Sequence, residues 1–194
     1  MENDLRNLIK TVLSLGNCSR PEYELVAKHL KSLSPCNALF FGVGHDSKIW
    51  DTINAEGNNL FLDNLQEWIE KIRPALGYSN IEKIEYTTKR TQWKKILNKH
   101  DLLLVQLPEI VWQTDWDFIF IDAPRGNKDF CPGRMQSIYM ASLLVARSTG
   151  LIKVLAHDYN RKVEKKYCNK YIGKKYLRKV VRKMAYFKIE NSIK

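Results

Sequence analysis

The sequence has no apolar run long enough to cross a membrane. Its longest apolar stretches, 101–107 and 116–121, are far shorter than the roughly 18 to 20 residues that a membrane helix needs. The first residues mix both charges and lack the apolar segment of a secretory signal. We therefore expect a protein that has no membrane contact and stays in the cytoplasm.

Cysteine, glycine and proline are also sparse. The four cysteines are far apart and include no Cys-x-x-Cys pair, which gives no support to a zinc knuckle or a dense disulfide framework. Nine glycines and six prolines are ordinary numbers, and no internal period stands out, so collagen-like, low-complexity and repeat architectures are excluded. The four thiols are expected to be reduced.

What is present suffices for one hydrophobic core. The chain has 194 residues, of which 44% are apolar and 27% charged. A chain of this size buries one sizeable core and leaves little room for a second. We expect a single domain over 1–194, with a helical extension at 1–33 and a core at 34–194 that includes a basic carboxyl-terminal segment.

The net charge of +11 is concentrated at the end of the chain. Residues 1–158 hold equal numbers of basic and acidic side chains, whereas residues 159–194 hold 13 basic and two acidic ones. Such a block attracts anionic partners, namely nucleic acid, an acidic polysaccharide or a phosphorylated molecule. A solvated lysine-rich helix face is the alternative interpretation.

Apolar spacing predicts two amino-terminal helices, at 5–13 and 21–33, followed by strands and helices that alternate. Strands are predicted at 37–41, 59–62, 81–86, 116–121, 151–156 and 185–189, and helices from 46 or 47 onward and at 65–72, 88–99 and 133–147. This alternation is typical of an α/β fold with a doubly wound sheet and helices on both faces. Ligands bind beyond the carboxyl ends of the strands in such sheets, so functional residues are expected there.

A Gly-x-Gly turn, Gly42-Val43-Gly44, follows the first predicted strand. Its bare backbone lets a ligand approach closely, and the start of the next helix favours a negative group. Asp63, at the end of the second predicted strand, is placed to bind two ribose hydroxyls. Together they predict a nucleoside-containing cofactor, for which either NAD or S-adenosylmethionine fits. A tight turn with an incidental surface aspartate is the alternative.

Two later strands end in acidic residues that are expected to be neighbours, Asp122 and Asp158. Their carboxylates can hold a divalent metal through oxygen ligands, or divide the roles of acid and base. Two helix-capping aspartates are the alternative. His157, next to Asp158, is either a base with a pKa near working pH or a packed histidine.

Three arginines, Arg125, Arg134 and Arg161, lie in loops or helix starts on the same side of the predicted sheet. Their forked donors suit carboxylates and phosphates. The alternative interpretation is solvent-facing charge balanced by nearby acids. The five tryptophans lie mostly at amphipathic or strand positions, so we interpret them as core residues and not as a base-stacking platform.

Several sequence segments match a known family in order. They are Ser34-Pro35-Cys36-Asn37, Phe40 to Ser47, Phe120 to Gly126, Pro132 to Met135 with Ile138-Tyr139, and His157 to Arg161 followed by Val163-Glu164. With these segments the chain resembles the plant polysaccharide-biosynthesis domain family that includes the glucuronoxylan 4-O-methyltransferases and their arabinogalactan-methylating relatives. The resemblance extends over residues 33–189.

The resemblance implies a Rossmann-like methyltransferase sheet that uses S-adenosylmethionine. The acceptor it implies is a sugar hydroxyl of a glucuronic-acid-containing or other anionic glycan. It further implies that Gly42 and Gly44 approach the methionine end of the cofactor, that His45 and Asp46 complete that loop, and that Asp63 holds the ribose.

A more distant similarity to metal-assisted catechol-type O-methyltransferases implies a divalent cation held by Asp122 and Asp158. Arg125 stands where those enzymes have a lysine base, and an arginine that stays protonated is no normal base. The residues expected to act in catalysis are Asp122, His157, Asp158 and Arg125, and those expected to bind the acceptor are Arg125, Arg134 and Arg161.

Other functions stay open at this point. The basic tail favours an RNA methyltransferase as the second hypothesis, and an inactive family member that binds or scaffolds glycans as the third. An NAD-dependent enzyme is a distant fourth. The sequence does not indicate an oligomeric state.

Overall fold

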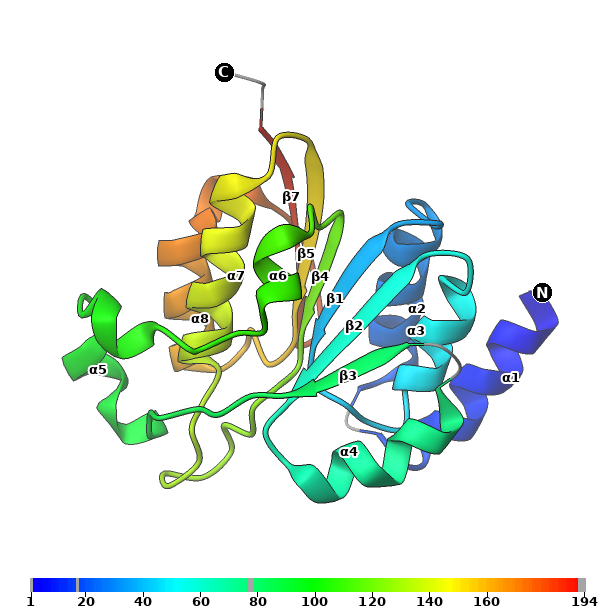
Figure 1. The fold of residues 1–194 in the computed structure, drawn as a ribbon, viewed down its shortest axis with the longest axis horizontal. Coiled ribbons are helices and arrows are strands. Elements are labelled where there is room, and N and C mark those ends of the chain that lie inside the picture. Colours follow the sequence, from blue (N-terminus) through cyan, green and yellow to red (C-terminus); the bar gives the residue numbers. More distant parts are fainter. Residues whose placement is uncertain (1, 17, 77–78, 192–194) are drawn as a thin grey trace.

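The structure is a computed structural model that describes residues 2–16, 18–76 and 79–191. Within these residues a mixed sheet of seven strands forms the centre of the molecule, in the order β3-β2-β1-β4-β5-β7-β6 (Figure 1). The strands from β1 to β5 are parallel, and β7 runs antiparallel to both of its neighbours. The strands are β1 (Asn37–Phe41), β2 (Asn58–Asp63), β3 (Asn80–Lys83), β4 (Phe118–Ile121), β5 (Leu151–Ala156), β6 (Leu177–Val181) and β7 (Met184–Glu190).

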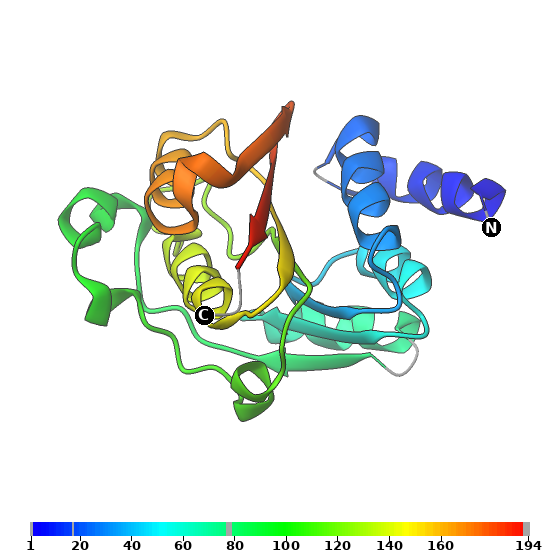
Figure 2. The ribbon, with the colours of Figure 1, turned by 90° about the horizontal axis from the view of Figure 1, so that it is seen from above.

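Helices lie on both faces of the sheet (Figures 1 and 2). On one side are α2 (Arg20–Lys31), α3 (Ser47–Ile53) and α4 (Gln66–Ile72), with α1 (Glu2–Leu13) packed outside them against α2 and α3. On the other side are α5 (Trp93–Ile96), α6 (Glu109–Gln113), α7 (Met135–Arg147) and α8 (Lys162–Tyr167). The prediction of a doubly wound, Rossmann-like sheet preceded by two helices is confirmed.

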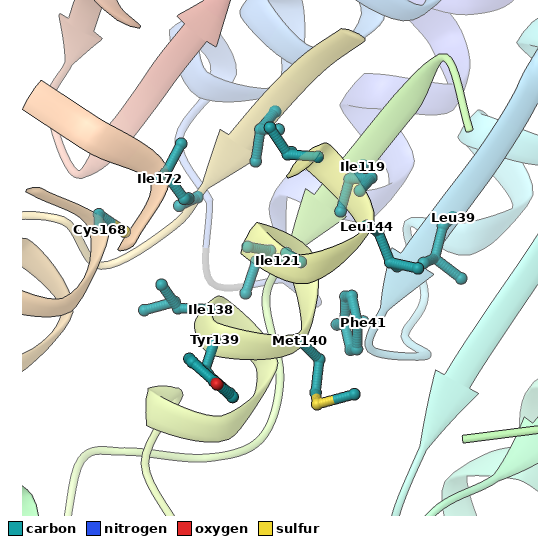
Figure 3. Packing of buried hydrophobic residues seen from close by; sticks show 14 of the residues in the cluster. Leu39, Phe41, Ile119, Ile121, Ile138, Tyr139, Met140, Leu144, Cys168 and Ile172 are labelled. Atoms are coloured by element: carbon teal, nitrogen blue, oxygen red, sulfur yellow. The ribbon is translucent and has the colours of Figure 1, made fainter. Parts of the chain in front are cut away.

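The alternation of side chains along each strand explains this two-sided covering. Leu39 and Phe41 of β1 pack in the cluster that includes α7, where Figure 3 shows them beside Leu144 and Met140. Their neighbours on β1 face the other way and pack with α2, α3 and α4. Since successive side chains of a strand point to opposite faces, a strand that is apolar throughout requires a cover on each side.

Two predicted elements are shorter than expected. The third strand ends at Lys83 and not at residue 86, and the helix predicted at 88–99 is reduced to a 3₁₀ turn and the four residues of α5. Side chains of α7 bind the intervening segment instead. The Thr87 N–H donates to Gln136 Oε1 at 2.9 Å, and the Ser137 hydroxyl donates to the Tyr86 hydroxyl at 2.8 Å. Contacts distant in sequence therefore replace the sheet ladder at this point.

The basic carboxyl-terminal segment is built into the fold. It forms α8, a short π-helix and 3₁₀ turn at 168–176, and the hairpin of β6 and β7, of which β6 was not predicted. β7 is buried between β5 and β6, whereas Arg178 and Lys179 are exposed on β6 at the sheet edge. Charged side chains on an edge strand discourage pairing with other chains. Part of the positive charge of residues 159–194 therefore lies on an edge strand. For that part, the interpretation as a lysine-rich helix face is wrong.

Two further predictions concerned membrane-spanning segments and the state of the cysteines. In the described part of the chain, no helix is both long and apolar enough to cross a bilayer. All four cysteines are free and buried.

Candidate active site

The predicted functional residues gather at the carboxyl ends of four parallel strands. β1 leads into the glycine turn, β2 ends at Asp63, β4 is followed by Asp122, and β5 by His157 and Asp158. Ile121 pairs with Ala156 in the ladder between β4 and β5. Asp122 and His157 are each one residue beyond that pair, so they meet at the sheet edge.

The glycine turn requires its first glycine. Gly42 has a φ of +128°, which side-chain-bearing residues rarely adopt, and a Cβ built on it would lie 3.2 Å from the Cβ of Ala123. The second glycine, Gly44, donates its N–H to Ser47 Oγ at 3.0 Å. A Cβ there would lie 2.9 Å from Asp46 Oδ1. The bare backbone therefore keeps space open above the turn, as the fit of a bound cofactor requires.

Asp63 ties the end of β2 to the glycine turn. Its Oδ2 accepts the N–H of Val43 at 2.9 Å, and its Oδ1 accepts the N–H of Leu65 at 2.9 Å. Burial raises the pKa of Asp63, although these backbone donors and the Arg125 charge act in the opposite direction. A carboxylate oxygen accepts more than one hydrogen bond, so the predicted contact with ribose hydroxyls is compatible with this geometry and stays a prediction.

A cavity of about 160 Å³ lies over the glycine turn. Its lining includes Gly42, Gly44, Asp46 and Asp63, together with Leu15 and Gly16 from the end of α1. His45 also lines it, with its ring edge-on to Trp68. Pockets for small molecules and cofactors typically measure about 300 to 1,000 Å³. The cavity over the turn is smaller than this range. We name this space the glycine-turn cavity.

Asp46 stands just before α3 and lines the same cavity. Burial and the negative charge of Asp122 raise the pKa of Asp46 to about 7. Its carboxyl group is therefore poised to ionise near neutral pH, and a cation entering the cavity would favour the ionised form.

Arg134 connects the two strand-end aspartates. It stands before the first turn of α7, where its Nη2 donates to Asp122 Oδ1 at 2.7 Å and to the Asp122 carbonyl oxygen at 2.6 Å. Its Nη1 lies 2.8 Å from Asp158 Oδ2, and Arg161 Nη1 lies 2.8 Å from that same oxygen. Asp158 has a φ of +60°, a left-handed conformation that is uncommon outside glycine and is often found at functional sites.

His157 completes this group. It is buried, and its Nδ1 lies 2.9 Å from Asp122 Oδ1. Burial alone would lower the pKa of His157, but the charge of Asp122 and its hydrogen bond raise it above the ordinary value. In the same way, burial alone would raise the pKa of Asp122, but Arg134 and His157 hold it below its usual range. Asp122 is thus a carboxylate at neutral pH, bonded to the Arg134 guanidinium and to the His157 imidazole.

The predicted metal site does not fit this geometry. The Arg134 guanidinium occupies the space between Asp122 and Asp158, and its charge repels a cation from the position that both carboxylates would share. Ligand atoms of Cys18, Asp122 and His157 do lie within 4.8 Å of one another. However, the Asp122 oxygen is already bonded to Arg134 and His157, and burial strongly raises the pKa of the Cys18 thiol.

A second cavity, of about 500 Å³, opens beside the ion cluster. Arg125, Lys128, Arg161 and Lys183 bring positive charge to its lining, and Phe130 on its wall is 70% exposed. We name it the basic cavity. Asp122 and Arg125 line both this cavity and the glycine-turn cavity. The two spaces therefore meet at these two residues.

Sequence reasoning gave no site role to two buried acids, although it placed Glu164 in one of the family segments. Glu164 of α8 lies near Arg134 and Arg161, and neither of its oxygens has a hydrogen-bond partner among the described residues. Burial raises its pKa. Glu22 of α2 lies 3.8 Å from His157 Nε2. The one signal for Glu22 in the sequence is a Ser-x-x-Glu capping box that begins at Ser19.

The sequence also gave no reason to single out Lys128, Phe130 and Lys183 in the basic cavity. The site residues that were predicted lie around the carboxyl ends of the parallel strands. Asp122, His157, Asp158, Arg134 and Arg161 form one bonded cluster. Arg125 is exposed at the rim of both cavities, and His45 lies on the glycine-turn side only.

The fold is a Rossmann-like sheet with the candidate site at the carboxyl ends of its parallel strands, an architecture that solved methyltransferase structures share. The structure of this chain is similar to the crystal structure of a methyltransferase-like protein from Silicibacter pomeroyi. The alignment covers 92% of this chain and 91% of that one, with a TM-score of 0.53 at 16% identity. Such a low identity shows that the fold is shared. The chain belongs to the IRX15/IRX15L/GXM family, whose model matches residues 21–101 and 97–187.

Two proteins similar to this chain come from Arabidopsis thaliana. The chain is 34% identical to glucuronoxylan 4-O-methyltransferase 3 over 87% of its own length and 62% of that protein. It is 31% identical to arabinogalactan O-methyltransferase 2 over 84% of its own length and 64% of that protein. The chain thus spans a little less than two thirds of each relative. The resemblance drawn from the sequence segments is confirmed.

Proposed function

We propose that this protein is an S-adenosylmethionine-dependent O-methyltransferase that acts on a sugar hydroxyl of an anionic glycan. The observation that carries the proposal is the meeting of the glycine-turn cavity and the basic cavity at Asp122 and Arg125. A group-transfer enzyme needs its donor and its acceptor in adjoining spaces, with the reacting atoms held at near-attack distance. The names of the Arabidopsis relatives support this activity.

The residues around the glycine-turn cavity fit the donor. Gly42 and Gly44 would let it approach the backbone, Asp63 would hold its ribose, and Asp46 with His45 would face its cationic methionine end. When bound, S-adenosylmethionine supplies a methyl group activated by a sulfonium charge. The acidic side chains that line this cavity favour a cationic ligand.

Asp122 is assigned to the acceptor hydroxyl. Its contacts with Arg134 and His157 use Oδ1, and Oδ2 has no polar contact among the described residues. The side chain is 25% exposed, at the junction of the cavities. Oδ2 would therefore accept the hydroxyl proton as the oxygen–carbon bond forms and the sulfur–carbon bond of the sulfonium donor breaks, with the neutral thioether as the leaving group. A weak base suffices there, because an oxygen that is being alkylated becomes strongly acidic.

The positive side chains of the basic cavity are assigned to an acidic sugar. Arg161 is paired with Asp158, whereas the charges of Arg125, Lys128 and Lys183 have no ion-pair partner within the described part of the chain. They suit the carboxylate of a glucuronic acid residue. The proposal includes no metal at Asp122 and Asp158, because the Arg134 guanidinium already lies between the two carboxylates and pairs with both.

Incubation with labelled S-adenosylmethionine and a panel of acceptors tests the proposal. We expect label in glucuronate glycans, little in neutral sugars and none in RNA. The label should resist mild alkali, which removes methyl esters and leaves methyl ethers. Transfer only to RNA, or no binding of S-adenosylmethionine by calorimetry, would refute the proposed activity. Activity lost with a chelator and restored by a divalent cation would refute its metal-free part.

A further inference from the structure

Glu22 is a buried carboxylate at the start of α2, in the segment that the sequence presents as an extension. It is 2% exposed. Its Oε2 accepts the N–H and the hydroxyl of Ser19, each at 2.7 Å. Burial alone would raise the pKa of Glu22, but these hydrogen bonds hold it below its usual value. Capping the helix accounts for one oxygen of this carboxylate and leaves the other to be explained.

The second oxygen, Oε1, binds the turn between β6 and β7. It accepts the N–H of Lys183 at 2.7 Å, across 161 positions of sequence. The carbonyl oxygen of Lys183 accepts the N–H of Tyr159 at 2.8 Å, directly after Asp158. Glu22 therefore fixes the backbone of a residue whose side chain lines the basic cavity.

The same oxygen faces the catalytic cluster. Oε1 lies 3.8 Å from His157 Nε2, which is buried and has no hydrogen-bond partner among the described residues. The imidazole is thus placed between two carboxylates, Asp122 on its Nδ1 side and Glu22 on its Nε2 side. The other charged or titratable groups around His157 are Arg134, Asp158, Asp46 and Cys18.

We propose that Glu22 is a positioning residue of the active site, which holds His157 against Asp122 and fixes the β6–β7 turn at the acceptor side. His157 then keeps its Nδ1–H on Asp122 Oδ1 and leaves Oδ2 to the acceptor. The helical segment before residue 34 is accordingly part of the catalytic structure. The kinetic part of this inference rests on the proposed methyl transfer, whereas the effect on His157 does not.

The variant Glu22→Gln tests the inference with little change of shape, because its amide oxygen still accepts the Lys183 N–H. Glu24→Gln is the matched control, since Glu24 lies on the same helix, 59% exposed, in a surface pair with Arg20. The titration of the His157 imidazole is followed by NMR in both variants and in the unaltered protein. Loss of the nearby negative charge should lower the pKa of His157 by about half a unit or more in Glu22→Gln, and leave it unchanged in Glu24→Gln.

Kinetics provide the second measurement. In Glu22→Gln we expect kcat to fall by about tenfold or more with a shifted pH profile, and the affinity for S-adenosylmethionine to change less than about twofold. A lower melting temperature with an unchanged His157 titration and pH profile would reduce Glu22 to a helix cap and overturn the inference. If the unaltered protein transfers no methyl group, the proposed function fails, and the NMR titration still decides the placement of Glu22 beside His157.

Discussion

The imidazole of His157 lies 2.9 Å from Asp122 across the carboxyl ends of two neighbouring strands. This contact joins two residues that could each have been a base into one unit, in which the imidazole is bonded to a carboxylate oxygen. Arg134, which stands just before α7, donates to the same oxygen of Asp122. Asp122 is therefore the residue on which the proposed chemistry depends most directly.

Replacing Asp122 by Asn should abolish most of the methyl transfer. The amide is similar in shape, but it cannot accept the hydroxyl proton, so we expect kcat to fall by about 100-fold or more. Calorimetry should show the affinity for S-adenosylmethionine within about threefold of the unaltered protein. Loss of donor binding with normal folding would instead place Asp122 in cofactor recognition.

Replacing Arg134 by Met should strongly destabilise the protein. The variant leaves Asp122 and Asp158 buried without their shared cation, and breaking a buried ion pair from one side costs about 3 to 5 kcal/mol. The free energy of unfolding in urea measures this loss. Arg178→Met, on the exposed edge strand, is the control and should stay within about 0.5 kcal/mol. A small effect of Arg134→Met would mean that water or a metal ion compensates the two carboxylates.

Replacing Gly42 by Ala should impair both folding and donor binding. The residue has a φ of +128° and the added methyl group meets Ala123, so we expect a loss of about 1 to 3 kcal/mol. Gly150→Ala is the matched control, because a Cβ at Gly150 meets nothing within 4 Å. Urea denaturation and calorimetry with S-adenosylmethionine give the two readouts. Normal donor affinity in Gly42→Ala would exclude this turn from the cofactor site.

Asp46 should make the stability depend on pH. Its folded-state pKa of about 7 is above its ordinary value of 3.8, so the folded protein binds this proton more tightly than the unfolded chain. The resulting stabilisation is fully present below about pH 4 and is lost as the pH rises through about 7. Asp46→Asn should flatten the fall in unfolding free energy over this range, as measured in urea at a series of pH values. Asp101→Asn, at an exposed position, should leave the curve unchanged.

Much of the fold could be predicted because the spacing of apolar residues along the sequence distinguishes helices from strands. The apolar run at β4 and the alternation of helices and strands followed from residues that are close in sequence. The end of β3 and the short α5 could not, since Gln136 and Ser137 of α7 bind that segment from far along the chain. β6 was missed because an exposed, charged edge strand lacks the apolar pattern of a buried one.

The sequence by itself determined the order of the elements from β1 to β5 and the ends of the four strands that carry the site, because hydrophobic periodicity and glycine turns act within a few residues. Only the tertiary structure decided how the charges at those ends are paired. Arg134 stands where a metal was expected, and Glu22 reaches His157 from a helix outside the predicted core. The physical reason is that ion pairs and buried hydrogen bonds form between groups brought together by packing, and their separation in sequence leaves no local trace.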